Sequence, residues 1–553
     1  MPTEGLLYVT MQPKGLSDTQ FHDWYNNEHG PLRLRLPFVT NGFRYRAKDG
    51  EKPEYLALYD ITDMDELTRK TYLDLRTDLI KTEREKKTMA QIDVGRLLYD
   101  LVEERKVPGF VPLENRADTD DSETRGNVLV AVTTASHPDP EKQAELERWY
   151  REEHFEMLSR VPGWRRSRLF KTAAIDSAAP QEIIALYEYA AVNGLGGELH
   201  QAAMNTPWRQ RLQTEVVTSK KRRVYEWFYT FGPAPRELSS IAKSDVIGPW
   251  SSNDGKTRTF PSPTRPAVES FVTTADGVEI PYRLEGSTDP YAPVVVLSNC
   301  ILADWKIWDR FVDAFFARKQ NQRYRVLRYL TRGRRSQSGE QAVTIDVLAS
   351  DVNALLEALR VPPKAARLIG VSLGGVTVLN TSLLYPERIA AFIACDTNSS
   401  APESNRKAWG DRVAMSEKEG AVDAETKEPI VGEELAEITT RRWFVPESYE
   451  TQPEVLDAVK QAVINNSLKG FAHSVNALCA YDIRDRMANA TVPGLFVAGA
   501  NDGVLPQTMQ KMAADLKGGA ELKIIERAGH LPMVEQPEAF ADVVTEYLGK
   551  IDR

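Results

Sequence analysis

The stretch Ala366-Arg-Leu-Ile-Gly-Val-Ser-Leu-Gly-Gly-Val-Thr-Val-Leu379 decides the fold of the second half of this chain. It opens with the apolar run Leu368-Ile369, which is typical of a buried strand, and continues with a helical pattern. The motif Gly370-x-Ser372-x-Gly374 therefore lies at a strand-to-helix turn, which is the setting of a nucleophile elbow. Glycines suit such a turn because a Cβ atom would clash where the chain is tightest. The spacing also recurs by chance, so an ordinary strand–helix connection stays open until Ser372 has partners.

A base and an acid for Ser372 follow later in the chain. Of the seven histidines, only His473 and His530 lie beyond residue 200, and His530 comes just after a strand-like run. Asp502 ends another apolar run, so Ser372, Asp502 and His530 each lie at the carboxyl end of a predicted strand. In this hypothesis Ser372 attacks an acyl carbon, His530 transfers the proton, and Asp502 orients the imidazole. Asp396 follows an earlier predicted strand and is a rival acid, whereas His473 is interpreted as structural.

Several further motifs accompany the Ser372 turn. They are Val296-Leu-Ser-Asn299 with Trp308-Asp309, Thr331-Arg-Gly333, Arg442-Trp-Phe444, Asp482-Ile-Arg484, Gly499-Ala-Asn-Asp502, and Gly529-His-Leu531 followed by Glu535-Gln-Pro537. With these motifs, residues from about 268 to 550 resemble the α/β-hydrolase superfamily, and most closely its 3-oxoadipate enol-lactonase branch. The resemblance implies an oxyanion hole formed by the backbone N–H groups of Leu373 and Ile301.

The chain departs from the pattern of this family at two places near the expected mouth of the site. It has Leu302 where family members usually carry a glycine, and Leu330-Thr-Arg-Gly-Arg-Arg335 where they carry Asp-x-Arg-Gly-His-Gly. Because of these departures, the resemblance does not establish an enol-lactone as the substrate. The three residues Ser372, Asp502 and His530 are not among the positions that differ.

Aromatic and arginine residues near these motifs are candidates for substrate binding. Trp409, Trp443 and Phe444 are expected to line an apolar pocket, with core packing as the alternative. Arg332 and Arg442 could each bind a substrate carboxylate through two hydrogen bonds, or serve as packing arginines in the cap or at the surface.

The first 230 residues contain an internal repeat. Phe21-His-Asp-Trp-Tyr-Asn-Asn-Glu-His29 recurs as Leu146-Glu-Arg-Trp-Tyr-Arg-Glu-Glu-His154 at an offset of 125. Each copy, over residues 1–106 and 126–231, has the pattern strand, helix, strand, strand, helix, strand, which is the ferredoxin-like unit. The apolar stripe of the first helix is expected to continue through Leu32 in copy one and Met157 in copy two.

This repeat resembles the EthD-like members of the dimeric α+β-barrel superfamily, of which Trp-Tyr-x-x-Glu-His is a signature. The resemblance implies that the two copies build one barrel within a single chain. It makes Tyr25, His29, Tyr150 and His154 a second candidate site, although a hydrogen-bonded core position is the preferred interpretation of each histidine.

Composition limits the partners of the protein. The chain of 553 residues has a formal net charge of −9, which argues against a nucleic-acid or polybasic membrane partner. No run approaches the ~18 apolar residues of a membrane span, and the first residues lack the pattern of a signal peptide, so we expect a cytoplasmic protein. The cysteines Cys300, Cys395 and Cys479 show no metal-ligand spacing and are interpreted as buried thiols.

The sequence thus predicts two repeats, a Pro- and Ser-rich linker over 232–267, and an α/β hydrolase over 268–553 with a cap over about 397–490. The predicted function is cofactor-free and metal-free hydrolysis of a carboxylic ester, such as a lactone or a small aromatic or polyketide-like ester, through an acyl-enzyme. An alternative is a bifunctional enzyme whose amino-terminal barrel performs a decarboxylation-type lyase or cyclase step. In a third hypothesis the repeats only dock or dimerise, and a homodimer stays open.

Overall fold

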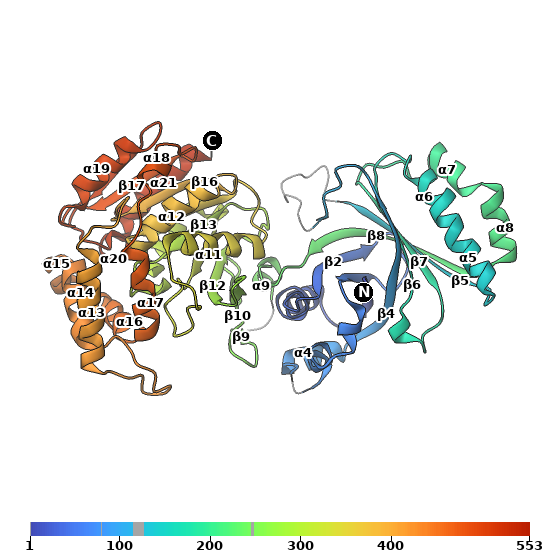
Figure 1. The fold of residues 1–553 in the computed structure, drawn as a ribbon, viewed down its shortest axis with the longest axis horizontal. Coiled ribbons are helices and arrows are strands. Elements are labelled where there is room, and N and C mark those ends of the chain that lie inside the picture. The colour runs from blue at the N-terminus through green and yellow to red at the C-terminus, as the bar shows by residue number, and fades with distance from the viewer. Residues whose placement is uncertain (1, 79, 114–125, 245–247, 553) are drawn as a thin grey trace. The chain divides into compact units, whose positions relative to one another are not determined.

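The computed structural model describes residues 2–78, 80–113, 126–244 and 248–552, which divide into two compact units, Met1–Pro235 and Arg236–Arg553 (Figure 1). Within these ranges, every helix is too short or too polar to cross a lipid bilayer.

The first unit consists of two copies of a β-α-β-β-α-β motif. The elements of copy one are β1 (Gly5–Pro13), α1 (Asp18–Trp24), η1 (Tyr25–His29), α2 (Gly30–Leu34), β2 (Val39–Ala47), β3 (Tyr55–Ile61), α4 (Glu83–Met89) and β4 (Ile92–Lys106). Those of copy two are β5 (Val128–Ser136), α5 (Pro140–Trp149), η5 (Tyr150–His154), α6 (Phe155–Leu158), β6 (Trp164–Thr172), β7 (Ile183–Tyr189), α7 (Glu198–Met204), α8 (Pro207–Glu215) and β8 (Val217–Thr230).

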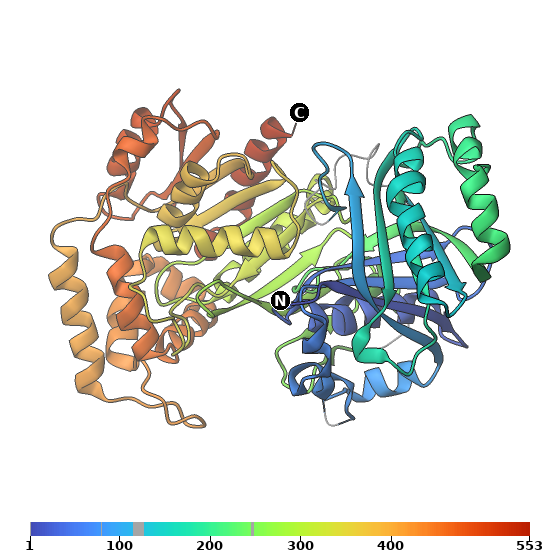
Figure 2. The same cartoon turned by 45° about the vertical axis from the view of Figure 1, so that its right-hand side comes forward.

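The eight strands form one closed antiparallel barrel in the order β1-β3-β2-β8-β5-β7-β6-β4. Each copy contributes four neighbouring strands, and the two sets join where β2 pairs with β8 and where β4 pairs with β6. Alternate residues along a strand face opposite sides: Leu6 and Tyr8 lie in a core shared by both copies, whereas Leu7 and Val9 pack against the helices of copy one. Figure 2 shows the helices of copy two, in teal and green, running alongside the strands.

A π-helical turn in the first helix of each copy changes which residues face the sheet. The turns η1 and η5 each contain one residue more than an α-helical turn, so positions beyond them move by one. Arg33 is consequently buried while Leu32 is only half-buried, and Leu158 is buried while Met157 is half-buried. The predicted stripes through Leu32 and Met157 are therefore corrected by one residue.

The second unit is a ten-stranded sheet in the order β18-β17-β16-β15-β13-β14-β12-β11-β10-β9. Its strands are β9 (Trp250–Ser251), β10 (Arg258–Phe260), β11 (Ala267–Thr273), β12 (Glu279–Gly286), β13 (Val294–Ser298), β14 (Arg325–Tyr329), β15 (Ala366–Val371), β16 (Ile389–Cys395), β17 (Gly494–Gly499) and β18 (Glu521–Ile525). The six strands from β13 to β18 run parallel to one another, whereas β12 joins β14 in antiparallel orientation.

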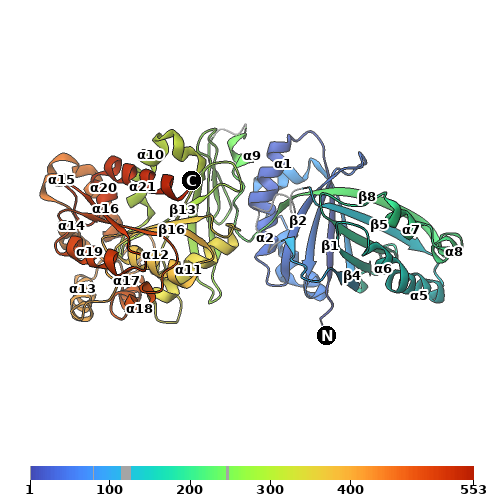
Figure 3. The same ribbon diagram turned by 90° about the horizontal axis from the view of Figure 1, so that it is seen from above.

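Helices cover both faces of this sheet, as Figure 3 shows from above. On one side lie α10 (Asp309–Ala317) and α21 (Pro537–Ile551), and on the other lie α11 (Ile345–Ala358) and α12 (Leu373–Leu384). Because β13 to β18 run parallel to one another, their carboxyl ends meet along one edge of the sheet. Ligands bind at this edge in open α/β sheets.

Two further features frame that edge. The cap consists mainly of α13 (Asn405–Glu419), α14 (Glu433–Trp443), α15 (Pro446–Thr451), α16 (Pro453–Ile464) and α17 (Leu468–Val475). β9 and β10 are the last two strands in the order of the sheet, and they lie inside the range 232–267 that was predicted to be a linker. β10 pairs with β11, and the Thr257 and Ser270 hydroxyls lie 2.8 Å apart, so this part of the range belongs to the second unit.

Candidate active site

Ser372 lies at the sharp turn between β15 and α12. Its backbone has φ 59° and ψ −118°, a conformation that costs about 1–3 kcal/mol for a residue other than glycine. The flanking glycines permit the turn: a Cβ atom on Gly370 would lie 2.1 Å from the Gly374 carbonyl oxygen, and one on Gly374 would lie 2.2 Å from the Ser298 carbonyl oxygen. Only these small residues let helix, turn and strand β13 approach so closely.

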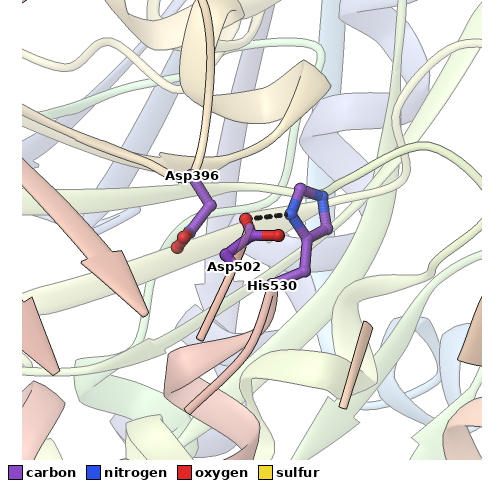
Figure 4. Close-up of side chains that lie close together, drawn as sticks. All are labelled: Asp396, Asp502 and His530. Atoms are coloured by element: carbon purple, nitrogen blue, oxygen red, sulfur yellow. Dashed lines mark hydrogen bonds and ion pairs between the residues drawn. The ribbon is translucent and has the colours of Figure 1, made fainter. Parts of the chain in front are cut away.

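His530 and Asp502 meet beyond the ends of β18 and β17. Nδ1 of His530 lies 2.7 Å from Oδ2 of Asp502, and both side chains are largely buried (Figure 4). Burial raises the pKa of Asp502, but His530, the hydrogen bonds from His530 and Asp396, and the charge of Arg442 outweigh this and leave the pKa below its ordinary value. Asp502 is therefore ionised near neutral pH and fixes the orientation of the imidazole.

Ser372 is tied to the same cluster through its backbone. Its N–H donates to the Cys395 carbonyl at 2.9 Å, and its carbonyl accepts from the Thr397 hydroxyl at 2.7 Å. Between these two residues lies Asp396, whose carboxylate comes within 4.8 Å of both His530 and Asp502. Within the described part of the chain no hydrogen bond joins the Ser372 hydroxyl to His530, and such bonds often form only when substrate is bound.

Asp396, the rival acid, has a different role in the geometry. It is 1% exposed, its Oδ1 accepts from the Gly499 N–H at 2.9 Å, and no N–H or O–H group of another described residue donates to its Oδ2. Burial raises the pKa of Asp396 well above its ordinary value, and the nearby charge of Asp502 adds to this. In its neutral form Asp396 donates a hydrogen bond to Asp502 rather than orienting His530.

The same three residues could in principle hold a metal ion. Asp396, Asp502 and His530 each offer one ligand atom, and these atoms lie within 4.8 Å of one another. Nδ1 of His530 is, however, already bonded to Asp502. The arrangement fits a hydrogen-bonded chain of side chains better than a set of free ligands.

The predicted oxyanion donors belong to the residue after Ser372 and to the loop that follows β13. The backbone N–H groups of Leu373, the first residue of α12, and of Ile301 have no acceptor among the described residues. Leu302 has φ 68°, so the loop adopts a left-handed conformation that glycine favours. Burial raises the pKa of the neighbouring Cys300 thiol to about 12, which removes it as a nucleophile near neutral pH.

The structure corrects the assignment of Arg332 to substrate binding. Its guanidinium group donates to Asp351 at 2.9 and 2.7 Å and to Asp276 at 3.0 Å, and it also bonds the Ser338 carbonyl. Because these carboxylates occupy both edges of its planar fork, Arg332 is a structural residue that joins β14 to α11. His473 likewise bonds the Ser338 hydroxyl, which suits the structural role expected for it.

The predicted aromatic residues differ in what they contact. The Trp443 ring stacks on His530 at a centroid distance of 6.2 Å, and the Trp443 carbonyl accepts from the His530 N–H at 2.7 Å. Trp443 therefore contacts the proposed base directly. Phe444 is buried, and Trp409 packs against Phe471.

Arg334 lies two residues beyond Arg332, and the sequence did not predict a role for it. It is 8% exposed, and none of its three guanidinium nitrogens has a hydrogen-bond partner among the described residues. Burial lowers its pKa to about 10, while the charges of Cys300 and Asp304 oppose this change. Asp304 is itself engaged by the Lys306 N–H at 2.7 Å. Arg334 is thus a buried cation near Cys300 and the predicted oxyanion loop.

Arg442 adds a second positive charge to this region. It exposes part of its side chain, yet desolvation of the guanidinium lowers its pKa, opposed by the charges of Asp502 and Cys300. Cys300 therefore lies within electrostatic range of both Arg334 and Arg442.

Glu535 is a further residue whose role the sequence did not reveal. It is 2% exposed and accepts from the Gly529 N–H at 2.6 Å, the Val445 N–H at 2.9 Å and the Ser448 hydroxyl at 2.6 Å. It thereby connects the loop that carries His530 to the start of α15 in the cap.

The four candidate residues of the first unit lie in two separate clusters. Tyr25 and His29 pack between the helices and strands of copy one, where the Tyr25 hydroxyl lies 3.0 Å from that of Tyr59. Tyr150 and His154 occupy the corresponding place in copy two. The pair Tyr25 and His29 and the pair Tyr150 and His154 therefore belong to two separate sites, one in each copy.

Comparisons with known proteins point to the second unit. A model of the alpha/beta hydrolase family matches residues 295–543. The protein named 3-oxoadipate enol-lactonase 2 from Acinetobacter baylyi is 29% identical over 272 residues, which are 49% of this chain and 93% of that protein. A crystal structure of a hydrolase from Pseudomonas aeruginosa PA01 is 30% identical and covers 51% of this chain and 98% of its own, with a TM-score of 0.44. The enol-lactonase structure from Burkholderia xenovorans LB400 is 26% identical and covers 50% of this chain and 99% of its own, also with a TM-score of 0.44.

The carboxyl-terminal half of the chain is an α/β hydrolase, and the protein is therefore a hydrolytic enzyme. Within this class it is related to 3-oxoadipate enol-lactonase.

Proposed function

We propose that the protein hydrolyses a carboxylic ester or lactone through an acyl-enzyme on Ser372, with His530 as general base and Asp502 as its orienting acid. The observation that carries this is the 2.7 Å contact between His530 and Asp502 next to the turn of Ser372. His530 takes the proton as Ser372 attacks and gives it to the leaving oxygen, and a water molecule then attacks the acyl-enzyme by the same route. The N–H groups of Leu373 and Ile301 stabilise the oxyanion.

The charges around this site favour a substrate that carries an anionic group, such as a carboxylate-bearing lactone or small aromatic ester. Arg334 is buried and its guanidinium nitrogens have no hydrogen-bond partner in the described part of the chain, a state that costs free energy which a bound carboxylate would recover. Arg442 lies within electrostatic range of the same thiol, Cys300. Two cations beside the oxyanion loop thus support binding of an acid-substituted ester.

Replacement of Ser372 tests the proposed mechanism. Ser372→Ala should lower kcat/KM for aryl esters and lactones by at least about a thousandfold, because the acyl-enzyme can no longer form. A serine-directed phosphonate should label the wild-type protein once and leave the variant unlabelled. Ser382→Ala on the same helix, whose hydroxyl only bonds the Leu379 carbonyl, is the matched control and should retain activity and labelling. Full activity of Ser372→Ala would remove the proposal.

A pair of substrates tests the anionic subsite. Arg334→Met should raise KM for a carboxylate-bearing aryl ester about tenfold or more and change the uncharged analogue little, because only the former loses a charge-assisted hydrogen bond. The exposed neighbour Arg335→Met is the control and should behave as wild type. Equal effects of Arg334→Met on the two esters would refute the assignment.

For the first unit, we infer an EthD-like barrel of the dimeric α+β type formed within one chain. The support is the closure of two four-stranded sets, one from each copy, into a single antiparallel barrel.

A further inference from the structure

The two copies of the repeat enclose cavities of different size at equivalent places. In copy one a cavity of about 20 Å³ lies between helices and sheet beside Tyr25 and His29. In copy two the corresponding cavity beside Tyr150 and His154 measures about 100 Å³. The first has room for about one water molecule, whereas the second could hold a small organic molecule.

The helices that close these cavities begin in the same way. Thr82 caps α4 and donates to Glu28, and Thr206 caps α8 and donates to Glu153 at the matching position of copy two. The residue three positions beyond each cap is Glu85 in copy one and Arg209 in copy two. The charge of this position is therefore reversed between the copies.

The exchange of Glu85 for Arg209 changes the hydrogen bonding of the buried histidine in each copy. Nδ1 of His29 lies 2.8 Å from Oε1 of Glu85, so the imidazole of copy one has a carboxylate partner. His154 is 5% exposed, and its Nδ1 has no hydrogen-bond partner among the described residues. A buried polar atom without a partner is costly unless something else fills the place.

The larger cavity is lined by cations and phenols, and its lining residues include no carboxylate. Arg209, Lys220 and Arg222 line it together with Tyr187 and His200. Nε of Arg209 and Nδ1 of His200 are buried without a hydrogen-bond partner among the described residues. Partial desolvation and the charges of Arg209 and Arg222 lower the pKa of Lys220 to about 8, so the site favours an incoming negative charge.

His154 is neutral at physiological pH because its surroundings lower its pKa. Burial lowers the pKa of His154 well below its ordinary value, the charges of Lys220 and Arg209 add to this, and the Ala203 carbonyl opposes it. The imidazole is therefore neutral and has a single N–H group, which the Ala203 carbonyl engages, while Arg209 and Lys220 supply the positive charge. The Trp149 ring stacks on His154 at a centroid distance of 4.3 Å and fixes its plane.

We propose that the copy-two cavity binds a small carboxylate, which takes the place that the Glu85 carboxylate occupies in copy one. The carboxylate accepts a hydrogen bond from Nε of Arg209 and is attracted by Lys220. Its small aliphatic part packs against the apolar lining, such as Val130 and Leu158. This site is separate from the hydrolase unit and does not depend on the triad.

Calorimetric titration of the full-length protein with propionate and with propionamide tests the proposal. Propionate should bind saturably with a dissociation constant of about millimolar or below, and propionamide at least about tenfold more weakly, because it lacks the charge. Arg209→Glu supplies the carboxylate that copy one already carries beside its histidine, so the variant should fold normally and lose propionate binding. Lys221→Glu makes the same change of charge on an exposed side chain of β8 that faces away from Lys220 and Arg222, and should bind as wild type.

A second pair of variants locates the bound anion. Arg334→Met removes the cation that is proposed to bind a carboxylate in the hydrolase unit, so any propionate bound there is lost, and saturable binding in the copy-two cavity should remain. Loss of binding in Arg334→Met but not in Arg209→Glu would place the anion in the hydrolase unit and overturn the proposal. Equal affinity for propionate and propionamide, or the absence of saturable binding of propionate, would overturn it as well.

Discussion

At the scale of single residues, the two carboxyl groups near His530 differ in pKa and therefore in protonation state. Asp502 bonds the imidazole directly, whereas Asp396 is fully buried and has a raised pKa because burial disfavours its charge. A neutral Asp396 can donate to Asp502 and accept from Gly499 at the same time. The geometry thus makes Asp396 a positioning residue and Asp502 the acid that contacts the proposed base.

Asparagine substitutions separate these roles. Asp396→Asn keeps an acceptor for Gly499 and a donor for Asp502, so kcat/KM should fall by less than about tenfold. Asp502→Asn removes the charge that orients and stabilises the imidazolium, and kcat should fall by about four orders of magnitude. Kinetics with one aryl ester measure both variants. The opposite order of losses would make Asp396 the acid of the triad.

The pH dependence of stability gives an independent check on Asp396. Because the folded-state pKa of Asp396 is raised, its contribution to stability is fully present below about pH 4 and is lost as the pH rises towards the folded-state pKa. Asp396→Asn cannot ionise. Its melting temperature, measured by calorimetry between pH 4 and pH 9, should therefore rise relative to that of the wild type as the pH increases. A constant difference would show that Asp396 does not titrate in this way.

Neighbouring arginines show why the sequence could not assign every site residue. Arg332 stands in a recognisable motif, but its partners Asp276 and Asp351 come from distant parts of the chain and occupy its guanidinium group. Arg334 has no such partners, and this is a property of the folded surroundings rather than of the local sequence. By contrast, the positive φ of Ser372 follows from local glycines, so that turn could be predicted from the sequence.

At the scale of secondary-structure elements, the approach of α12 to β13 depends on Gly374. A Cβ atom there would lie 2.2 Å from the Ser298 carbonyl oxygen and 2.7 Å from that of Asn299, and both are backbone atoms that cannot move aside alone. Gly374→Ala should destabilise the hydrolase unit by about 1–3 kcal/mol and reduce activity, because the shift reaches the oxyanion loop. Thermal melting and ester kinetics measure the two effects.

Another helical glycine provides the control for this substitution. Gly410 lies inside α13, and a Cβ atom there would have no neighbour within 4 Å. Gly410→Ala should therefore stabilise the protein by about 0.5–1 kcal/mol and leave activity unchanged. A Gly374→Ala variant that is as stable and active as Gly410→Ala would contradict the close approach.

Periodicity predicted the type and order of most elements but not their local irregularities. The α/β order of the second unit follows from apolar runs that alternate with amphipathic segments, and the hydrolase fold could be predicted from it. Beyond the π-turns η1 and η5, Arg33 and Leu158 are buried in place of Leu32 and Met157, which a fixed 3.6-residue period cannot show. The short strands β9 and β10 contain few apolar residues, and they are recognised as strands only because β10 pairs with β11 and β9 pairs with β10.

At the scale of the whole molecule, the chain offers two units whose activities can be separated. Because the division falls between Pro235 and Arg236, fragments 1–235 and 236–553 each keep all of their strands. Fragment 236–553 should retain the ester hydrolysis of the intact protein, and fragment 1–235 should have none. Activity confined to fragment 1–235 would instead favour a lyase or cyclase reaction in the barrel.

A shorter hydrolase fragment tests the limits of the second unit. Fragment 265–553 lacks β9 and β10, so it loses the contact between Thr257 and Ser270 and exposes the edge of β11. It should melt at a lower temperature than fragment 236–553 and aggregate more readily, because an uncovered strand edge can pair with other chains. Calorimetry and light scattering compare the two fragments at equal concentration. Identical behaviour would mean that β9 and β10 are dispensable and that the unit begins at β11.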